Sequence, residues 1–276
     1  MRLPRPPGWL VYAGGVAAIL FLALGRQERA DSPSPPPTAL SEDQAPLAPS
    51  SPFSAKAFAM PGKPETASGT AFSVGDGGVW LTARHVLEGC RQPAIVVAGG
   101  QGVAAKARGF DGDVAVLTTV GGAPSLPIAL SPSLTRGQRA YLPGFPQAGP
   151  GEAALRLLGP QVVRKRGRGE APQVMLAWAE VGRTDGLHGT LSGLSGAPVL
   201  DASGQVVGVT LAEAPRRGRI YSSTPQTMRG ALTAAGVKIA APGAIPGEAI
   251  SVENYGRVAD DLRRDLRVAQ VVCLGV

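Results

Sequence analysis

The feature that most constrains the fold of this chain is a series of short apolar runs joined by glycine-rich turns, which begins at Ser68. Runs of this length favour strands over helices. The composition suits many turns, since 38 glycines and 26 prolines occur among 276 residues. Two groups of six short strands predict an all-β fold of sandwiches or barrels. The first group is Ser68–Val74, Gly78–Ala83, Ala94–Val97, Val103–Phe110, Val114–Thr119 and Leu126–Leu130. The second group is Arg139–Gly144, Leu155–Arg164, Val174–Gly182, Pro198–Leu200, Gln205–Ala212 and Arg219–Thr224.

Two helical segments are predicted after these strands. Residues Pro225–Gly236 begin with proline and end with glycine, as short helices do. Within Val252–Leu266, the apolar residues Val258, Leu262 and Leu266 share one helical face. A last strand is predicted at Val268–Leu274.

Ser195 lies in a segment that can expose a hydroxyl group. It is flanked by Gly193 and Gly196 within TLSGLSGAPVL, residues 190–200. Glycines on both sides allow backbone paths that other residues resist, so amide N–H groups can converge on one point. A nucleophilic serine needs such donors, because they stabilise the oxyanion formed during attack on a carbonyl carbon. Taken alone, the segment favours an ordinary hairpin turn, so its interpretation depends on partners elsewhere.

Two further residues are suitable partners for this serine. His85 lies at the end of an apolar run, where a strand gives way to a loop, and its imidazole can bridge a hydroxyl and a carboxylate. Asp113 opens another apolar run and so lies at the mouth of a strand. Asp111 competes for the same role, but it precedes a glycine and has the character of a turn residue. Taken alone, a histidine such as His85 is more often a buried core residue.

Together these residues resemble the trypsin-like (chymotrypsin-fold) serine peptidases, most closely their bacterial stress-protease-like branch. The order histidine, aspartate, serine is that of the family. The segment LTARH, which ends at His85, corresponds to the family's Thr-Ala-x-His motif. DVAVL, which begins at Asp113, corresponds to its Asp-hydrophobic-Ala-hydrophobic-Leu motif, and GLSGAP at 193–198 to Gly-x-Ser-Gly-Gly-Pro. The resemblance covers residues 66–236.

The resemblance implies a role for each of these residues. Ser195 would attack the scissile carbonyl, His85 would accept its proton, and Asp113 would orient the imidazole. The N–H groups of Gly193 and Ser195 would form the oxyanion hole. The implied reaction is hydrolysis of protein or peptide substrates through an acyl-enzyme, which needs no cofactor.

Several positions depart from the family pattern. Leu194 replaces the aspartate of members that are activated by a cut N-terminus, so this activation route is not available. Ala197 replaces a glycine, which is a small change. Gly189 gives no support for a preference for Arg or Lys, so a small or aliphatic substrate residue is expected. The candidates for the lining of the substrate pocket, by analogy, are Gly189, Leu211 and Tyr221.

The resemblance also implies two six-stranded Greek-key barrels with the active site between them. The peptidase domain would span residues 65–240, with barrels at about 65–135 and 136–240. His85 and Asp113 would lie on the first barrel and Ser195 on the second. Residues 241–276 would form an extension with a short helix and a strand. They are too few for a PDZ-type domain, so none is expected.

The N-terminal residues 1–26 have the pattern of a signal anchor or signal peptide. Arg2 and Arg5 precede an uncharged apolar run from Trp9 to Gly25, at the short end of what spans a bilayer. An uncleaved transmembrane helix is favoured, with the rest of the chain exported. Residues 27–64, rich in Pro, Ser and Ala, predict a linker. We therefore expect a protein of the bacterial periplasm or cell envelope, anchored to the inner membrane.

The chain contains two cysteines, Cys90 and Cys273. An even pair in an exported chain favours a disulfide, which would tie the C-terminal segment to the region beside His85. The alternative is two unrelated buried thiols. Two cysteines and two histidines scattered this widely lack the spacing of a metal site, so no metal is expected.

The net charge of +7 has its densest clusters at residues 164–168 and 216–219. A nucleic-acid site would need a known module or interleaved aromatic residues, and aromatics make up only 5% of the chain. The clusters are interpreted as solvated loops, and no nucleic-acid partner is expected.

Two functions remain open from the sequence. The first is an exported serine endopeptidase. The second is a catalytically silent or gated homologue that binds peptides or a protein partner through the same cleft. Because all three triad residues are present, a silent protein would have to be inactive through geometry, for example through Leu194 or Ala197 distorting the oxyanion loop.

Overall fold

Two β-sheets and two α-helices make up the described part of the chain. In the computed structural model this part comprises residues 58–59, 68–75, 77–97, 100–164, 172–237 and 249–274, all within the unit Pro36–Val276. The predicted N-terminal anchor, nearly all of the linker and most of the basic cluster 164–168 lie outside these ranges. Among the described residues, no helix is long and apolar enough to cross a membrane.

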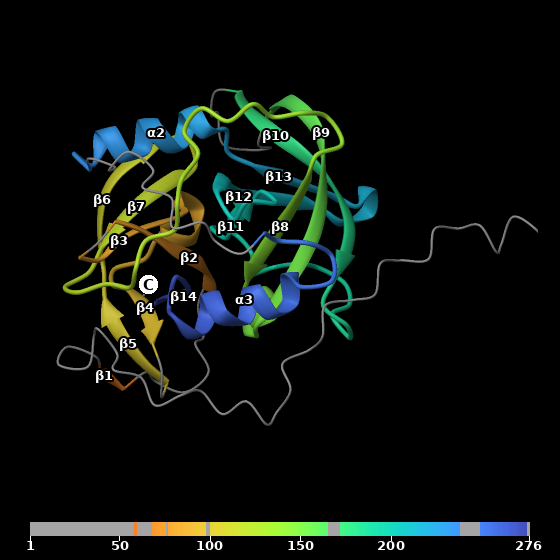
Figure 1. Ribbon diagram of the computed structural model, residues 1–276. Helices are drawn as coiled ribbons and strands as arrows, with labels where there is room; N and C mark the ends of the chain where they lie inside the picture. Colours follow the sequence, from red (N-terminus) through yellow and green to blue (C-terminus); the bar gives the residue numbers. More distant parts are fainter. Residues whose placement is uncertain are drawn as a thin grey trace, which may run out of the picture. The chain divides into compact units, whose positions relative to one another are not determined.

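The second group of strands forms a closed barrel (Figure 1). Its strands are β8 (Arg139–Gly144), β9 (Gly151–Val163), β10 (Gln173–Arg183), β11 (Pro198–Leu200), β12 (Val206–Ala214) and β13 (Arg219–Ser222). They are arranged in the order β10-β13-β12-β11-β8-β9, and the pairing of β9 with β10 closes the ring. Trp178 is fully buried in this core, and its indole N–H donates to Ser222 Oγ at 2.9 Å. A six-stranded barrel at this place in the chain confirms the prediction.

The first group of strands forms an open, half-barrel sheet, so the prediction of a second closed barrel is wrong. Its eight strands are β1 (Phe58–Ala59), β2 (Ser68–Gly75), β3 (Val79–Ala83), β4 (Pro93–Val97), β5 (Gln101–Ala104), β6 (Lys106–Asp111), β7 (Val114–Thr118) and β14 (Val268–Cys273), in the order β1-β5-β4-β14-β2-β3-β7-β6. Only Ala105 separates β5 from β6, although they lie near opposite ends of this order. One residue is too short for a turn, so β5 and β6 cannot fold back on each other and pair as antiparallel neighbours. The sheet therefore curls without closing by hydrogen bonds.

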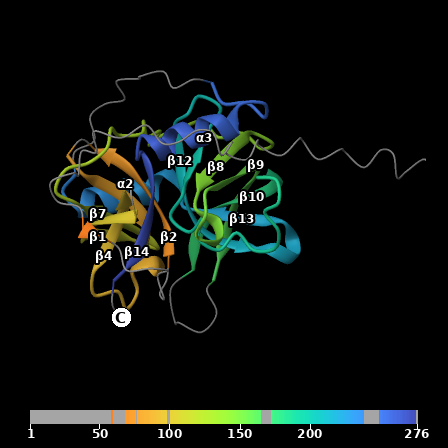
Figure 2. The same cartoon turned by 90° about the horizontal axis from the view of Figure 1, so that it is seen from below.

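The strand in the middle of the first sheet comes from the C-terminal part of the sequence. β14 lies between β4 and β2 and pairs antiparallel with both (Figure 2). Val271 stands opposite Gly69 on one side and Ile95 on the other, and its side chain is fully buried. The sequence predicted a strand here but assigned it to an extension beyond the peptidase domain.

The predicted strand Leu126–Leu130 does not form. This segment makes only an isolated bridge, between Ile128 and Val206 of β12. Both residues are buried, and the Leu126 N–H donates to the Ser73 carbonyl of β2, so the apolar pattern here reflects burial between the first sheet and the closed barrel rather than a strand. Besides β1, the strand that joins the first sheet from outside the first group is β14.

The two helices agree with the predicted segments. α2 (Pro225–Ala234) begins after Thr224, whose hydroxyl oxygen accepts the Thr227 N–H, and the chain turns away at Gly236 with φ of 68°. It packs against β6 and β7 (Figure 1). α3 (Tyr255–Arg264) packs against β8 and β9 of the closed barrel.

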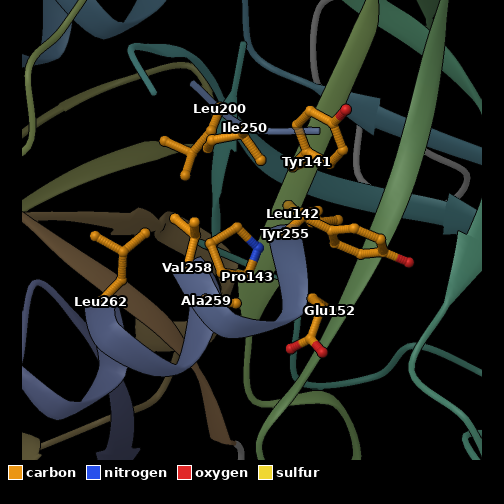
Figure 3. A pocket seen from close by; sticks show the side chains of 10 residues that line it. All are labelled: Tyr141, Leu142, Pro143, Glu152, Leu200, Ile250, Tyr255, Val258, Ala259 and Leu262. Carbon is orange, nitrogen blue, oxygen red and sulfur yellow. The ribbon is translucent and has the colours of Figure 1, made fainter. Parts of the chain in front are cut away.

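The side chains between α3 and β8 are almost completely packed (Figure 3). Tyr255, Val258 and Leu262 of the helix contribute to this interface, and the cavity that remains has about 10 Å³, room for one water at most. Arg263 extends from the helix to the carboxylate of Glu152 on β9, at 2.9 Å. The C-terminal segment thus contacts both sheets, through α3 on one and through β14 in the other.

Candidate active site

His85 and Asp113 are positioned by neighbouring strands of the first sheet. His85 lies in the 3-10 turn Arg84–Leu87, directly after β3, and Asp113 directly precedes β7, which pairs with β3. The Arg84 N–H donates to the main-chain carbonyl of Asp113 at 2.7 Å. The His85 N–H donates to Asp113 Oδ1 at 3.0 Å. Both the backbone and the carboxylate of Asp113 are therefore fixed to the histidine turn.

Asp113, His85 and Ser195 form a continuous line of side-chain contacts. Asp113 Oδ2 lies 2.9 Å from His85 Nδ1, and His85 Nε2 lies 2.9 Å from Ser195 Oγ. The Asp113 side chain is 3% exposed and that of His85 is 30% exposed. A proton on Nδ1 satisfies the buried carboxylate and leaves Nε2 free to accept the hydroxyl proton.

Asp111 lies elsewhere. Its carboxylate approaches Gly230 of α2 so closely that a Cβ at Gly230 would lie 1.8 Å from Asp111 Oδ2. The carboxylate facing His85 is that of Asp113, the one preferred from the sequence.

The loop that carries Ser195 is anchored to the first sheet by Thr70 of β2. The Thr70 N–H donates to the Ser195 carbonyl at 2.8 Å, and its hydroxyl donates to the Gly193 carbonyl at 2.8 Å. Gly193 has φ of 99°, and a Cβ there would lie 2.3 Å from the carbonyl oxygen of Phe145. Only glycine fits this position, both because of its backbone angle and because of the close approach.

A second anchor comes from the turn between β8 and β9. The Gln147 N–H donates to the Ser192 carbonyl. In a trans peptide the N–H points away from the carbonyl, so the Gly193 N–H points away from Gln147. The Leu194 carbonyl accepts the Ala197 N–H at 2.9 Å in the same way. Within the described ranges, the N–H groups of Gly193 and Ser195 donate to no other group of the protein.

A cavity of about 360 Å³ opens beside Ser195 and His85. Its apolar lining consists of Leu142, Leu191, Leu194, Leu211, Ala212 and Ile220. Its polar lining, besides Ser195 and His85, consists of Thr190, Ser192, Thr210 and Glu213. Of the three residues predicted to line the pocket, Leu211 is among these. Gly189 and Tyr221 are not, but their neighbours Thr190 and Ile220 are.

Glu213 was not singled out from the sequence. It follows the apolar part of β12, and β12 has a register shift against β13 between Thr210 and Ala212. The four consecutive residues 210–213 of this strand line the cavity, and no pattern in the sequence indicated that the cavity would extend to Glu213. The sequence signal that could have indicated Glu213 is an acidic residue directly after an apolar strand in the same half of the fold as Ser195.

Cys90 and Cys273 form a disulfide with Cα atoms 5.5 Å apart, as predicted. It joins the end of β14 to the segment that follows the histidine turn. Within the described ranges, no group of three or more His, Cys, Asp or Glu side chains could hold a metal ion.

A buried charged cluster lies between α3 and the start of β9. Burial raises the pKa of Glu152, and the guanidinium of Arg263 opposes this rise. Burial also raises the pKa of Asp260, the other acidic partner of Arg263. Arg263 further donates to the main-chain carbonyl of Gly151 at 3.1 Å. The cluster therefore holds the C-terminal helix onto the start of β9.

Comparison with known proteins defines the class. Residues 69–209, about half of the chain, match the family described as trypsin-like peptidase domain. The chain belongs to this family, and it is a serine endopeptidase. The matched segment includes His85, Asp113 and Ser195.

The two solved forms of the Rv3671c protease show the same fold. The active form of the Rv3671c protease from M. tuberculosis is 23% identical, with a TM-score of 0.52 over 65% of this chain and 78% of that chain. An inactive form of Rv3671c is 24% identical, with a TM-score of 0.50 over 61% and 84%. The HtrA-type protease AlgW with a decapeptide is 20% identical, with a TM-score of 0.46 over 56% and 47%. No curated protein matched the sequence.

Proposed function

We propose that this endopeptidase is exported and membrane-anchored, and that it cleaves peptide bonds through Ser195, His85 and Asp113. The observation that carries the catalytic assignment is the line of two 2.9 Å contacts from Asp113 through His85 to Ser195. The two unused N–H groups beside the serine support the same assignment.

In the acylation step, Ser195 Oγ attacks the scissile carbonyl carbon while His85 Nε2 takes the hydroxyl proton. The buried Asp113 carboxylate stabilises the imidazolium that forms. The oxyanion is held by the N–H groups of Gly193 and Ser195, each worth about 3 kcal/mol of transition-state stabilisation. His85 then gives its proton to the leaving amine, and an acyl-enzyme remains.

In the deacylation step, His85 removes a proton from water, which attacks the ester carbon of the acyl-enzyme. The same two N–H groups hold the second oxyanion. Collapse of this intermediate releases the new carboxyl end of the peptide and returns the proton to Ser195 Oγ. Neither of these two reaction steps needs a cofactor.

Fluorophosphonate labelling of the purified full chain tests the assignment. Labelling that is lost in Ser195→Ala would show an activated serine. Asp113→Asn should lower kcat by about 10⁴-fold, because it disturbs the imidazole tautomer. Asp111→Asn is the matched control and should leave kcat unchanged. A folded wild-type protein that does not label would refute the assignment and favour a silent or gated peptide-binding homologue.

Export and anchoring rest on the N-terminal pattern. Arg2 and Arg5 before the apolar run Trp9–Gly25 support insertion with the basic end in the cytoplasm. The disulfide between Cys90 and Cys273 supports an oxidising compartment. Fusion of residues 1–64 to alkaline phosphatase, which is active only outside the cytoplasm, tests this part. Loss of phosphatase activity when residues 9–25 are deleted would support it, and no activity of the intact fusion would contradict it.

A further inference from the structure

We infer that Glu213 makes the pocket beside Ser195 selective for a substrate residue with a cationic side chain, Lys or Arg. This inference rests on the proposed function, because it names the substrate class of the same site. It replaces the small or aliphatic residue expected from the sequence.

The first step of the argument is the position of the carboxylate. Glu213 lies on β12, directly opposite Ile220 of β13 in the strand pairing. Both residues line the cavity that Ser195 and His85 also line. A side chain held in this cavity while its main-chain carbonyl faces Ser195 therefore lies within the reach of Glu213.

The second step is the chemistry of the lining. Leucines at four positions and Ile220 provide apolar walls, and Glu213 provides the only acidic side chain among the cavity's described lining residues. Lys and Arg combine an apolar stem with a charged tip, so the stem can contact the apolar walls while the tip pairs with the Glu213 carboxylate. An aliphatic side chain would exclude water from this carboxylate without offering its charge a counterion, which is unfavourable.

The third step is the unused capacity of this carboxylate. Glu213 Oε2 accepts the Leu191 N–H at 2.8 Å, and Oε1 accepts the Thr190 hydroxyl. A carboxylate has about four acceptor positions, so about two remain. None of the ion pairs formed among the described residues includes Glu213. Its two neutral donors fix its direction and leave its charge for a ligand.

None of the nearby described basic residues forms an ion pair with the Glu213 carboxylate. Arg183 reaches the same loop, at the Gly189 carbonyl, but its guanidinium pairs with Glu180. Arg216 and Arg217 are exposed in the turn that follows β12, where solvent screens them. Arg219 stands opposite Ala214 in the strand pairing, beyond Glu213.

A second polar group in the cavity independently indicates a ligand. Thr210 is 4% exposed, and its hydroxyl oxygen has no hydrogen-bond partner among the described residues. Thr210 lines the same cavity as Glu213. Buried hydroxyl groups are seldom left unpaired, so this one is suited to a polar group of the bound substrate.

The test uses the full chain and two peptide substrates that differ only in the residue before the cut, Lys in one and norleucine in the other. Norleucine keeps the stem of Lys without its ammonium group. The wild-type protein should have the higher kcat/KM on the Lys peptide. Glu213→Gln should reduce the ratio of the two kcat/KM values by about 10-fold to 100-fold, since it removes a hydrogen bond between charged groups. Glu253→Gln is the matched control, because Glu253 is exposed, lies outside the cavity and loses the same charge.

A binding measurement separates this inference from the catalytic assignment. Benzamidine carries a cation on an apolar ring and can be titrated into Ser195→Ala by calorimetry. Its affinity should fall by about 10-fold to 100-fold when Glu213→Gln is added. An unchanged substrate ratio together with unchanged benzamidine affinity would overturn the role of Glu213. If the wild-type protein does not label with fluorophosphonate, the catalytic assignment fails, and the benzamidine result still decides the inference.

Discussion

The two halves of the proposed active site are completed in different ways. The barrel that carries Ser195 closes with strands β8 to β13, which follow one another in the chain. The sheet that carries His85 and Asp113 depends on β14, which comes after the whole barrel. A site shared by two units needs both of them folded. The half with His85 and Asp113 should therefore be the more easily unfolded one, because its central strand β14 is distant in sequence from the strands that it joins.

The largest effect is expected from a charge in the middle of β14. Val271→Asp places a carboxylate without a partner between β2 and β4, at a fully buried position. The loss of stability should be on the order of 5 kcal/mol, comparable with the whole stability of many domains. Gln270→Asp, at the half-buried neighbouring position, is the control and should cost much less.

Two buried tryptophans can report which half unfolds. Trp80 lies in the first sheet and Trp178 in the closed barrel. Fluorescence of variants that keep one of them, with the others replaced by Phe, should show that Val271→Asp exposes Trp80 first. Simultaneous exposure of both would break the comparison, because it would mean that the two halves unfold as one unit.

The second largest effect is expected from the disulfide. Replacing Cys90 and Cys273 by Ser releases a link between residues 183 apart in the sequence. The loop-entropy account gives a loss of about 3–5 kcal/mol. Urea unfolding should show a lower midpoint, and the wild-type protein under reducing conditions should match the variant. Equal midpoints for oxidised and reduced protein would mean that hydrogen bonds and packing alone hold β14.

A smaller effect is expected in the second half, where Gln147 adds a local anchor for the Ser195 loop to the one that Thr70 provides from the first sheet. Gln147 has φ of 53°, and its side-chain amide donates to the carbonyls of His188 and Thr190 at 2.7 and 2.9 Å. Gln147→Gly keeps the main-chain donor to Ser192 but loses these two bonds. The rate of fluorophosphonate labelling should fall by about tenfold, because the loop is less well fixed. Ala148→Gly, at φ of 65°, removes no side-chain hydrogen bond and should label at the wild-type rate.

The smallest effect is expected at the contact between α3 and the barrel. Burial raises the pKa of the Tyr255 phenol, which is 2% exposed and packs near Tyr141 with ring centroids 5.3 Å apart. In the unfolded chain the phenol of Tyr255 ionises near pH 10, and in the folded chain it ionises only at higher pH. The free energy of unfolding is therefore unaffected by this group below pH 10 and falls as the pH rises beyond it.

Tyr255→Phe should remove part of this alkaline loss. At pH 8 the change should stay within about 1 kcal/mol, since the hydroxyl has no hydrogen-bond partner among the described residues. Urea unfolding of both proteins between pH 8 and pH 11 measures the difference. An identical decline in the two proteins would show that Tyr255 does not limit the stability of this contact.

Local chemistry could be predicted from the sequence, whereas the choice of strand partners could not. His85, Asp113 and Ser195 could be singled out because each stands in a short motif with its own chemical reason, and their side chains do lie in contact. The apolar runs predicted most strands, since burial leaves a trace within a few residues. An apolar run shows that a segment is buried, but not which strand it pairs with. The segment around Ile128 was therefore predicted as a strand of the first barrel, and β14 was predicted to lie outside that barrel. Glu213 escaped notice for a related reason, because the cavity is formed jointly by β8, β12, β13 and the Ser195 loop, and no single segment of the sequence shows how they meet.

The place of β14 in the chain also sets an order of events during synthesis. The ribosome makes β2 to β7 first and the whole closed barrel next, and only then the strand that completes the first sheet. Until that strand arrives, β2 and β4 lack the neighbour that separates them, and His85 and Asp113 stand on an unfinished support. A nascent chain that ends before Val268 should therefore fail to label with fluorophosphonate, even with Ser195 already in place. The peptidase would stay inactive towards its own emerging chain, and towards other chains made beside it, until β14 has been made.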